Sequence, residues 1–294
     1  KPDYWWAFTY LDQDNIIADR KSPNASIYAW SSIDFMYDGY GRSLDAHTYI
    51  HETGHILGLP DYYDMQSESS IGALGGLDMM DFNIGDHNAY SKYMFNWVNP
   101  EIVKENKVVN LKPTSESGEF VILPTINYNG TPFAEYLMLE YLTPTALNEK
   151  DSHGYAGNNS AMYQEPGIRL THVDSRIAKF SNITGDFIEY TDTLQLSKEV
   201  FTDIAHSNTP SLSSGKNNIF EQIRLIRQVG FETEFYSSQD DLFYEGDVFD
   251  IQEEKYANYF YYSGKFNNKE SIKYKIKVNT LDSNYANISI EVGK

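Results

Sequence analysis

Residues 51–64 read HETGHILGLPDYYD, and this stretch decides which fold and chemistry the chain is expected to have. His51 and His55 are four positions apart, so on a helix they lie on one face and can bind the same metal ion. Glu52 stands beside them, where its carboxylate can take a proton from an attacking water and return it to a leaving amine. The pattern therefore predicts a metal-dependent hydrolase.

The residues that follow extend this pattern. Gly58 and Asp61 come three and six positions after His55. Glycine readily adopts the left-handed backbone that ends a helix, and the residue before Pro60 is disfavoured from helical geometry. We therefore expect the chain to turn after Gly58 and to bring the Asp61 carboxylate back toward both histidines. Two imidazoles and one carboxylate leave a fourth position for water, which is typical of a catalytic zinc site.

Local signals predict a helix around the two histidines. The helix is expected over residues 43–58, with Ser43 as its N-cap and Gly58 at its end. A second helix is expected over residues 87–97. The residues expected to face inward are Ile50, Gly54 and Leu57 in the first helix and Tyr90, Met94 and Trp97 in the second.

The stretch from His51 to Asp64 resembles the zinc motif of the metzincin peptidases. Its continuation, LPDYYD, is similar to the LPDxYD segment of the immune inhibitor A-like secreted metallopeptidases of bacteria. Three further stretches are similar to that family: residues 76–81 to its WDLMS segment, residues 90–98 to a helix ending in GWV, and residues 166–174 to a PGxxIxHVD strand. The resemblance is detailed over residues 45–100, patchy to residue 230 and faint beyond.

This resemblance implies roles for individual residues. His51, His55 and Asp61 would be the ligands of one catalytic zinc ion, and Glu52 would be the general base and acid. Met80 would be the methionine that supports the metal from below, and Gly58 would support the turn. The resemblance also implies a secreted or cell-surface bacterial protein.

The chain departs from the family pattern at three positions in this region. Leu77 replaces the usual Trp, Asp81 replaces a Ser, and Phe82 stands where some metzincins carry a Tyr that assists at the transition state. That role is therefore unassigned. Fewer residues precede His51 than a complete metzincin upper subdomain has, so we expect its first part to be missing.

Other ligand sets stay open at this point. If Asp61 only caps the turn, Asp64 or Asp78 can complete the site. A thermolysin-like Glu ligand on a second helix is not expected, because no Glu occurs between Glu68 and Glu101. His47 lies one turn before His51, but it is about 12 Å along the helix axis from His55. We therefore expect His47 behind the ligands or at the surface.

The expected fold class is α+β. Residues 1–100 would form a metzincin-like catalytic core, residues 101–237 a β-rich extension, and residues 238–294 a C-terminal antiparallel β-sandwich. Alternating apolar runs bounded by Gly, Asn, Asp and Pro predict the strands. Their expected ranges are 120–123, 135–142, 167–173, 187–196, 223–226, 259–262, 271–278 and 286–292.

Composition limits the partners and cofactors. The chain has 42 acidic and 23 basic residues, a formal net charge of −19, which argues against a nucleic-acid partner. It has no Cys, so any metal must be bound by His and carboxylates. No apolar run is long enough to insert into a membrane. The chain starts at Lys1–Pro2 without a Met or a signal segment, so we expect a processed piece whose propeptide has been removed.

Several weaker signals have two interpretations each. Acidic clusters at Asp12–Asp19, Asp186–Asp192 and Asp240–Asp250 suit either structural Ca²⁺ or a solvated acidic face. His172 and Asp174 are two positions apart, so on a strand they point to the same side. They could bind Ca²⁺ or line a cleft, or they could form the polar edge of a strand. The aromatic run Tyr256–Tyr262 suits either a binding surface for carbohydrate or protein or ordinary packing.

The sequence thus predicts a secreted zinc endopeptidase that hydrolyses proteins or peptides without a covalent intermediate. Two alternatives remain. One is a catalytically degenerate peptidase fold that serves as an adhesin or binding protein, with a structural zinc. The other is a specialised protease directed at glycoproteins or matrix proteins. The presence of Glu52 favours an enzyme, since a structural zinc site needs no base.

Overall fold

The computed structural model describes residues 7–11, 27–37, 44–64, 73–154, 161–209, 220–230 and 237–293. Helices and strands are both present in these ranges, which confirms the α+β class. None of the helices in the described ranges has the length and apolar character needed to cross a membrane.

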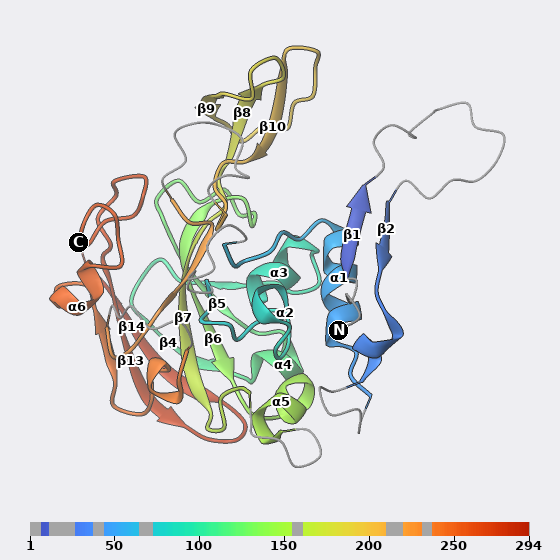
Figure 1. Cartoon of the computed structure of the whole chain (residues 1–294). Coiled ribbons are helices and arrows are strands. Elements are labelled where there is room, and N and C mark those ends of the chain that lie inside the picture. Colours follow the sequence, from blue (N-terminus) through green and yellow to red (C-terminus); the bar gives the residue numbers. More distant parts are fainter. Residues whose placement is uncertain are drawn as a thin grey trace.

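A five-stranded sheet forms the centre of the molecule (Figure 1). Its strands, in spatial order, are β11 (Ile223–Ile226), β7 (Gly167–Asp174), β6 (Glu135–Leu142), β5 (Val121–Pro124) and β3 (Glu101–Ile102). Neighbouring strands are antiparallel except for the β3–β5 pair. Every residue of β6 and β7 is buried, so both faces of this sheet are covered.

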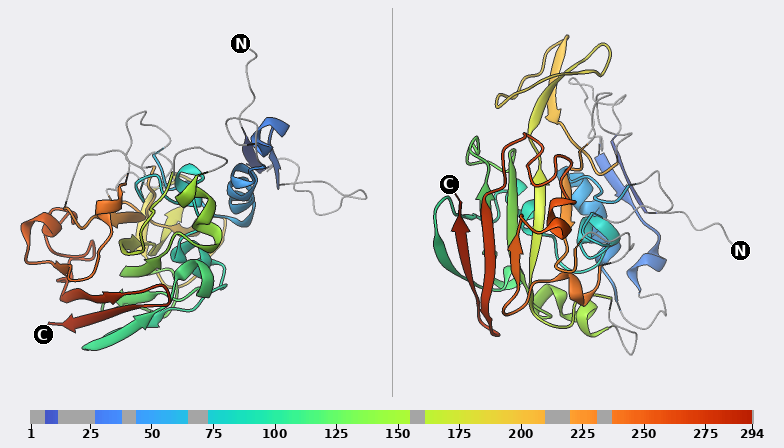
Figure 2. Two further views of the ribbon diagram at one scale, coloured as in Figure 1. Left: turned by 90° about the horizontal axis from the view of Figure 1, so that it is seen from below. Right: turned by 90° about the vertical axis from the view of Figure 1, so that its left-hand side faces the viewer.

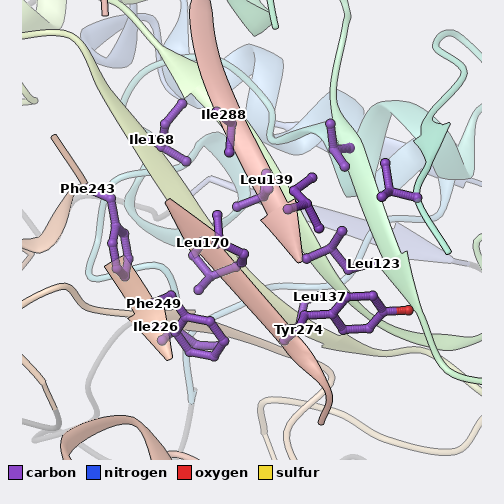
Figure 3. Close-up of a cluster of buried hydrophobic side chains, with 14 of the residues drawn as sticks. Leu123, Leu137, Leu139, Ile168, Leu170, Ile226, Phe243, Phe249, Tyr274 and Ile288 are labelled. Carbon is purple, nitrogen blue, oxygen red and sulfur yellow. The ribbon is translucent and has the colours of Figure 1, made fainter. Parts of the chain in front are cut away.

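A four-stranded antiparallel sheet packs on one face of the central sheet (Figure 2). It consists of β12 (Val248–Asp250), β13 (Tyr274–Leu281), β14 (Ala286–Val292) and β4 (Lys107–Leu111). Side chains from both sheets, among them Leu139, Leu170 and Ile288, meet in one apolar core (Figure 3). Because β14 pairs with β4, this sheet crosses the predicted boundary at residue 237.

Helices lie on the other face of the central sheet (Figure 1). They are α1 (His47–Leu57), α2 (Met79–Phe82) and α3 (Ala89–Met94). Alternate residues of β6 point to opposite faces, so Tyr136 and Met138 join Met80 and Tyr90 in a second core. The remaining short helices are α4 (Thr114–Ser117), α5 (Glu149–His153), α6 (Glu254–Ala257), η1 (Ile33–Met36), η2 (Ala146–Asn148) and η3 (Gln239–Asp241).

Two small sheets complete the described structure. The hairpin of β1 (Phe8–Leu11) and β2 (Ile27–Trp30) contacts α1. A three-stranded sheet, in the order β10 (Val200–Ile204), β8 (Ile177–Ser181) and β9 (Phe187–Tyr190), projects away from the central sheet (Figure 1).

The predicted helices are longer than the observed ones. The predicted N-cap Ser43 lies outside the described residues, and α1 begins at His47 after Ala46. The predicted inner face is wrong for Ile50 and Leu57, which are 42% and 51% exposed, because α1 buries the side that carries the histidines. The second helix spans only α3, because Asn88 caps its start and Asn96 adopts a positive φ after its end; Trp97 is exposed, not inward-facing.

Most predicted strands exist. The ranges 135–142, 223–226 and 286–292 are confirmed, and the strand expected at 167–173 extends one residue further, to Asp174. The strands expected at 120–123 and 271–278 are displaced by one and three residues. The strand expected over 187–196 ends at Tyr190. The strand expected over 259–262 is wrong, because this segment forms turns after α6. Tyr256, Tyr259 and Phe260 enter the core from there, so packing accounts for these aromatic side chains.

Candidate metal centre

Three side chains that the sequence singled out converge at the end of α1. His51 Nε2 and His55 Nε2 are 3.0 Å apart, and Asp61 Oδ1 is 3.1 Å from the former and 3.3 Å from the latter. Tetrahedral zinc with bonds near 2.0–2.1 Å separates its ligand atoms by about 3.3 Å. The three atoms are therefore spaced as ligands of one zinc-sized ion. Within the described ranges no other three His, Cys, Asp or Glu residues converge in this way.

Hydrogen bonds on the far side of each ring fix which nitrogen faces the site. His51 Nδ1 lies 2.8 Å from the Met79 carbonyl oxygen, and His55 Nδ1 lies 2.8 Å from that of Leu59. A carbonyl oxygen only accepts, so each Nδ1 carries the hydrogen and each neutral ring presents the Nε2 lone pair. Two lone pairs and a carboxylate oxygen then face one another, an arrangement that a cation stabilises.

The Asp61 carboxylate supports this conclusion. Its Oδ1 is buried and accepts no hydrogen bond, although buried polar atoms are normally satisfied. Burial alone would lower the pKa of His55, but the contact with the Asp61 carboxylate raises this pKa overall. Burial alone would raise the pKa of Asp61, but the two imidazoles hold it well below its usual range. A buried carboxylate oxygen without a hydrogen-bond partner, set between two imidazole nitrogens, is a donor set that fits a divalent metal ion.

Gly58 shapes the chain between the histidines and Asp61. It follows α1 with a φ of 106°, in the left-handed region that favours glycine. Its N–H donates to the His55 carbonyl oxygen, and the Leu59 N–H donates to that of Gly54, each at 3.0 Å. The helix thus ends where the sequence predicted, and the following turn carries Asp61 to the two histidines.

Met80 packs against the back of the ligand helix. It is fully buried in α2, and a Cβ atom on residue 54 would lie only 2.6 Å from its sulfur. Glycine at position 54, between the two histidines, therefore lets α2 approach α1 closely. Since the neighbouring Met79 carbonyl accepts from His51, this segment both supports the helix and orients one ligand. That contact is compatible with the supporting role predicted for Met80.

Asp78 and Asp81, the acidic residues of α2 and its N-cap, form hydrogen bonds within the fold and are not part of the ligand group. Asp78 caps α2 by accepting from the Met80 N–H and also accepts from the backbone and side chain of Asn88. Burial raises the pKa of Asp78 to about 7 and that of Asp81 to about 6. Asp81 accepts from the N–H groups of Leu74 and Gly76. Neither Asp78 nor Asp64 belongs to the convergent group.

A buried ion pair that the sequence analysis missed connects the central sheet to this region. Arg169 of β7 binds Glu140 of β6 at 2.9 Å and donates to the Leu77 carbonyl oxygen. Glu140 in turn accepts from the Ala89 N–H at the start of α3. The available signal was a charged residue within each of two otherwise apolar strands, since such residues are rarely buried without a partner.

His47, which is partly buried at the start of α1, binds two carboxylates. Its Nε2 lies 2.8 Å from Asp151, and its Nδ1 contacts Asp45. Burial opposes the charged form, but the two carboxylates outweigh it and raise the pKa of His47 to about 9. Asp151 also accepts from the Gly85 N–H, so the ion pair joins the start of α1 to α5 and to the segment after α2.

The His47 ion pairs predict a pH-dependent stability. Because the folded pKa is raised above the ordinary value of 6.5, the stabilisation is complete below about pH 6.5 and is lost as the pH rises through about 9. Since the imidazole is partly solvated, we expect the protonated His47 to contribute about 1–2 kcal/mol to the free energy of unfolding. The measurement is the free energy of unfolding of wild type and H47Q across this range. H153Q, at an exposed histidine, should show no such pH-dependent difference. A difference between wild type and H47Q that does not change with pH would contradict the prediction.

Among the described residues, the acidic groups that suggested calcium do not form a cluster that could hold a cation. His172 lies 3.0 Å from Glu135, and Asp174 binds Arg176 through both oxygens at 2.7 Å, so these side chains have partners inside the fold. Asp12–Asp19 lies outside the described residues. Within the described ranges, the other two acidic clusters do not bring three carboxylates together. Calcium binding stays a prediction.

Comparisons with known proteins gave no match. No protein-family model, no curated protein and no solved structure matched the chain. The resemblance to the immune inhibitor A-like peptidases therefore stays a prediction.

Proposed function

We propose that this protein is a zinc-dependent endopeptidase that hydrolyses peptide bonds of proteins or peptides. One observation carries the proposal: two histidine Nε2 atoms and an aspartate oxygen converge at the spacing of tetrahedral zinc ligands, one residue from the buried carboxyl side chain of Glu52. The family resemblance adds the expectation that the enzyme acts as a secreted or cell-surface protein of a bacterium.

The chain's own residues have distinct tasks in this reaction. His51, His55 and Asp61 would hold the metal, which when bound supplies Lewis acidity that lowers the pKa of water and polarises the scissile carbonyl. Glu52 accepts the proton of the attacking water and donates it to the departing amine. The carbonyl groups of Met79 and Leu59 hold the two imidazoles in the tautomer that binds metal.

The binding-protein alternative is less well supported by this site. Structural zinc sites are usually closed by four protein ligands, whereas three converge here among the described residues. A purely structural site also has no use for a buried carboxylate beside the ligands. The alternative of a protease specialised for glycoproteins or matrix proteins changes the substrate and leaves the chemistry the same.

Metal analysis combined with a cleavage assay tests the proposal. We expect one zinc ion per chain by elemental mass spectrometry and cleavage of a denatured protein substrate. A zinc chelator should abolish cleavage, and added zinc should restore it, because the ligands bind metal reversibly. Cleavage that persists after the metal has been removed, or full zinc occupancy without any cleavage, would contradict the assignment.

A further inference from the structure

Thr9, far from α1 in sequence, contacts the side chain of Glu52. The Thr9 hydroxyl lies 2.8 Å from Glu52 Oε2 and 2.9 Å from the backbone carbonyl oxygen of the same residue. The hydroxyl donates its single hydrogen to these two acceptors. No other hydrogen bond to the Glu52 carboxylate is formed within the part of the chain that the structure describes.

The β1–β2 hairpin explains why Thr9 points at α1. Side chains alternate along a strand, and Phe8 and Tyr10 lie exposed on either side of the half-buried Thr9. Phe8 stacks on Trp30 across the hairpin, with ring centroids 5.9 Å apart, and Tyr10 contacts Tyr28. These cross-strand pairs fix the register, which sets the Thr9 hydroxyl against the helix.

We infer that Thr9 is a positioning residue that orients the Glu52 carboxylate for proton transfer. The inference rests on the proposed function, because it assigns Glu52 the role of the base. A general base must lie within hydrogen-bonding reach of the proton that it takes. Thr9 holds Oε2, so Oε1 is the oxygen that remains to meet the attacking water. The bond from one hydroxyl to both acceptors also ties the carboxylate to its own backbone.

Three variants separate this role from a general structural one. T9V removes the hydroxyl and keeps the branched shape, whereas T9S keeps the hydroxyl. T53V is the matched control, because the Thr53 hydroxyl lies on the same helix and donates to the Tyr49 carbonyl oxygen at 2.7 Å, not to the Glu52 carboxylate. In T9V we expect kcat to fall about 10- to 100-fold with KM and zinc content unchanged. T9S and T53V should stay close to wild type.

A second readout does not depend on activity. Carbon-13 labelling of the glutamate carboxyl groups in the zinc-free protein gives a resonance for Glu52, which E52Q identifies by removing it. We expect this resonance to move in T9V and to stay in place in T9S and T53V. An unmoved resonance in T9V, or an equal loss of kcat in T9S and T9V, would overturn the inference. Wild type that lacks chelator-sensitive cleavage would instead refute the proposed function, while the resonance still reports on the contact.

Discussion

Replacing Glu52 with glutamine is expected to abolish peptide cleavage while the protein still binds zinc. Glutamine has nearly the same shape, and its amide cannot accept the proton of an attacking water or return it to a leaving amine. We expect kcat to fall by about 10²- to 10⁴-fold, the usual contribution of a general acid and base. The three ligands do not include Glu52, so the zinc content should equal that of wild type.

The control for this variant is E105Q, at an exposed glutamate between β3 and β4. It removes the same charge far along the chain from the candidate metal centre and should leave kcat unchanged. E52Q with wild-type cleavage would remove Glu52 from the mechanism. If purified E52Q contains no zinc, Glu52 contributes to metal binding and not to proton transfer.

Replacing Asp61 with asparagine is expected to cost most of the metal affinity and, with it, the activity. The amide oxygen is a weaker ligand, and the substitution removes the negative charge that offsets the metal and acts on both imidazoles. Partners that only orient a ligand contribute about 10- to 100-fold to metal affinity, so loss of a ligand should cost more than about 100-fold. Competition with a chromogenic chelator measures the affinity.

D64N provides the matched control, because Asp64 was the other aspartate of the motif that the sequence left as a candidate ligand. The structure places Asp61 and not Asp64 in the convergent group, so D64N should keep the wild-type zinc affinity. If D64N loses zinc and D61N keeps it, the ligand set described above is wrong. Unfolding curves of both zinc-free variants show whether a loss of binding reflects a loss of folding.

The parts of the site that the sequence predicted are those that depend on neighbouring residues. The helical spacing of His51 and His55, the helix end at Gly58 and the return of Asp61 all follow from local backbone preferences within eleven positions. The same holds for β6 and β14, whose ranges are marked by apolar runs between turn residues. These features can be predicted from the local sequence because they do not depend on contacts with distant segments.

The remaining features depend on contacts between distant segments. The predicted inner face of α1 failed at Ile50 and Leu57, because the helix buries its histidine side against Met80, a contact that amphipathic patterning does not encode. The bond from Thr9 to Glu52 joins residues 43 positions apart. The aromatic run from Tyr256 to Tyr262 had strand-like composition, and its turns became apparent only once the core that receives its side chains was known.

The pairing of β14 with β4 has a consequence for how the chain is made. Asn110 of β4 lies opposite Asn287 of β14, so the residue that pairs with Asn110 is synthesised 177 residues later. Until residues 286–290 leave the ribosome, the edge of β4 and the apolar side of the central sheet have no cover. Contacts of such long sequence separation slow folding and expose aggregation-prone surface. Nascent chains halted before residue 286 should therefore need a chaperone to stay dispersed.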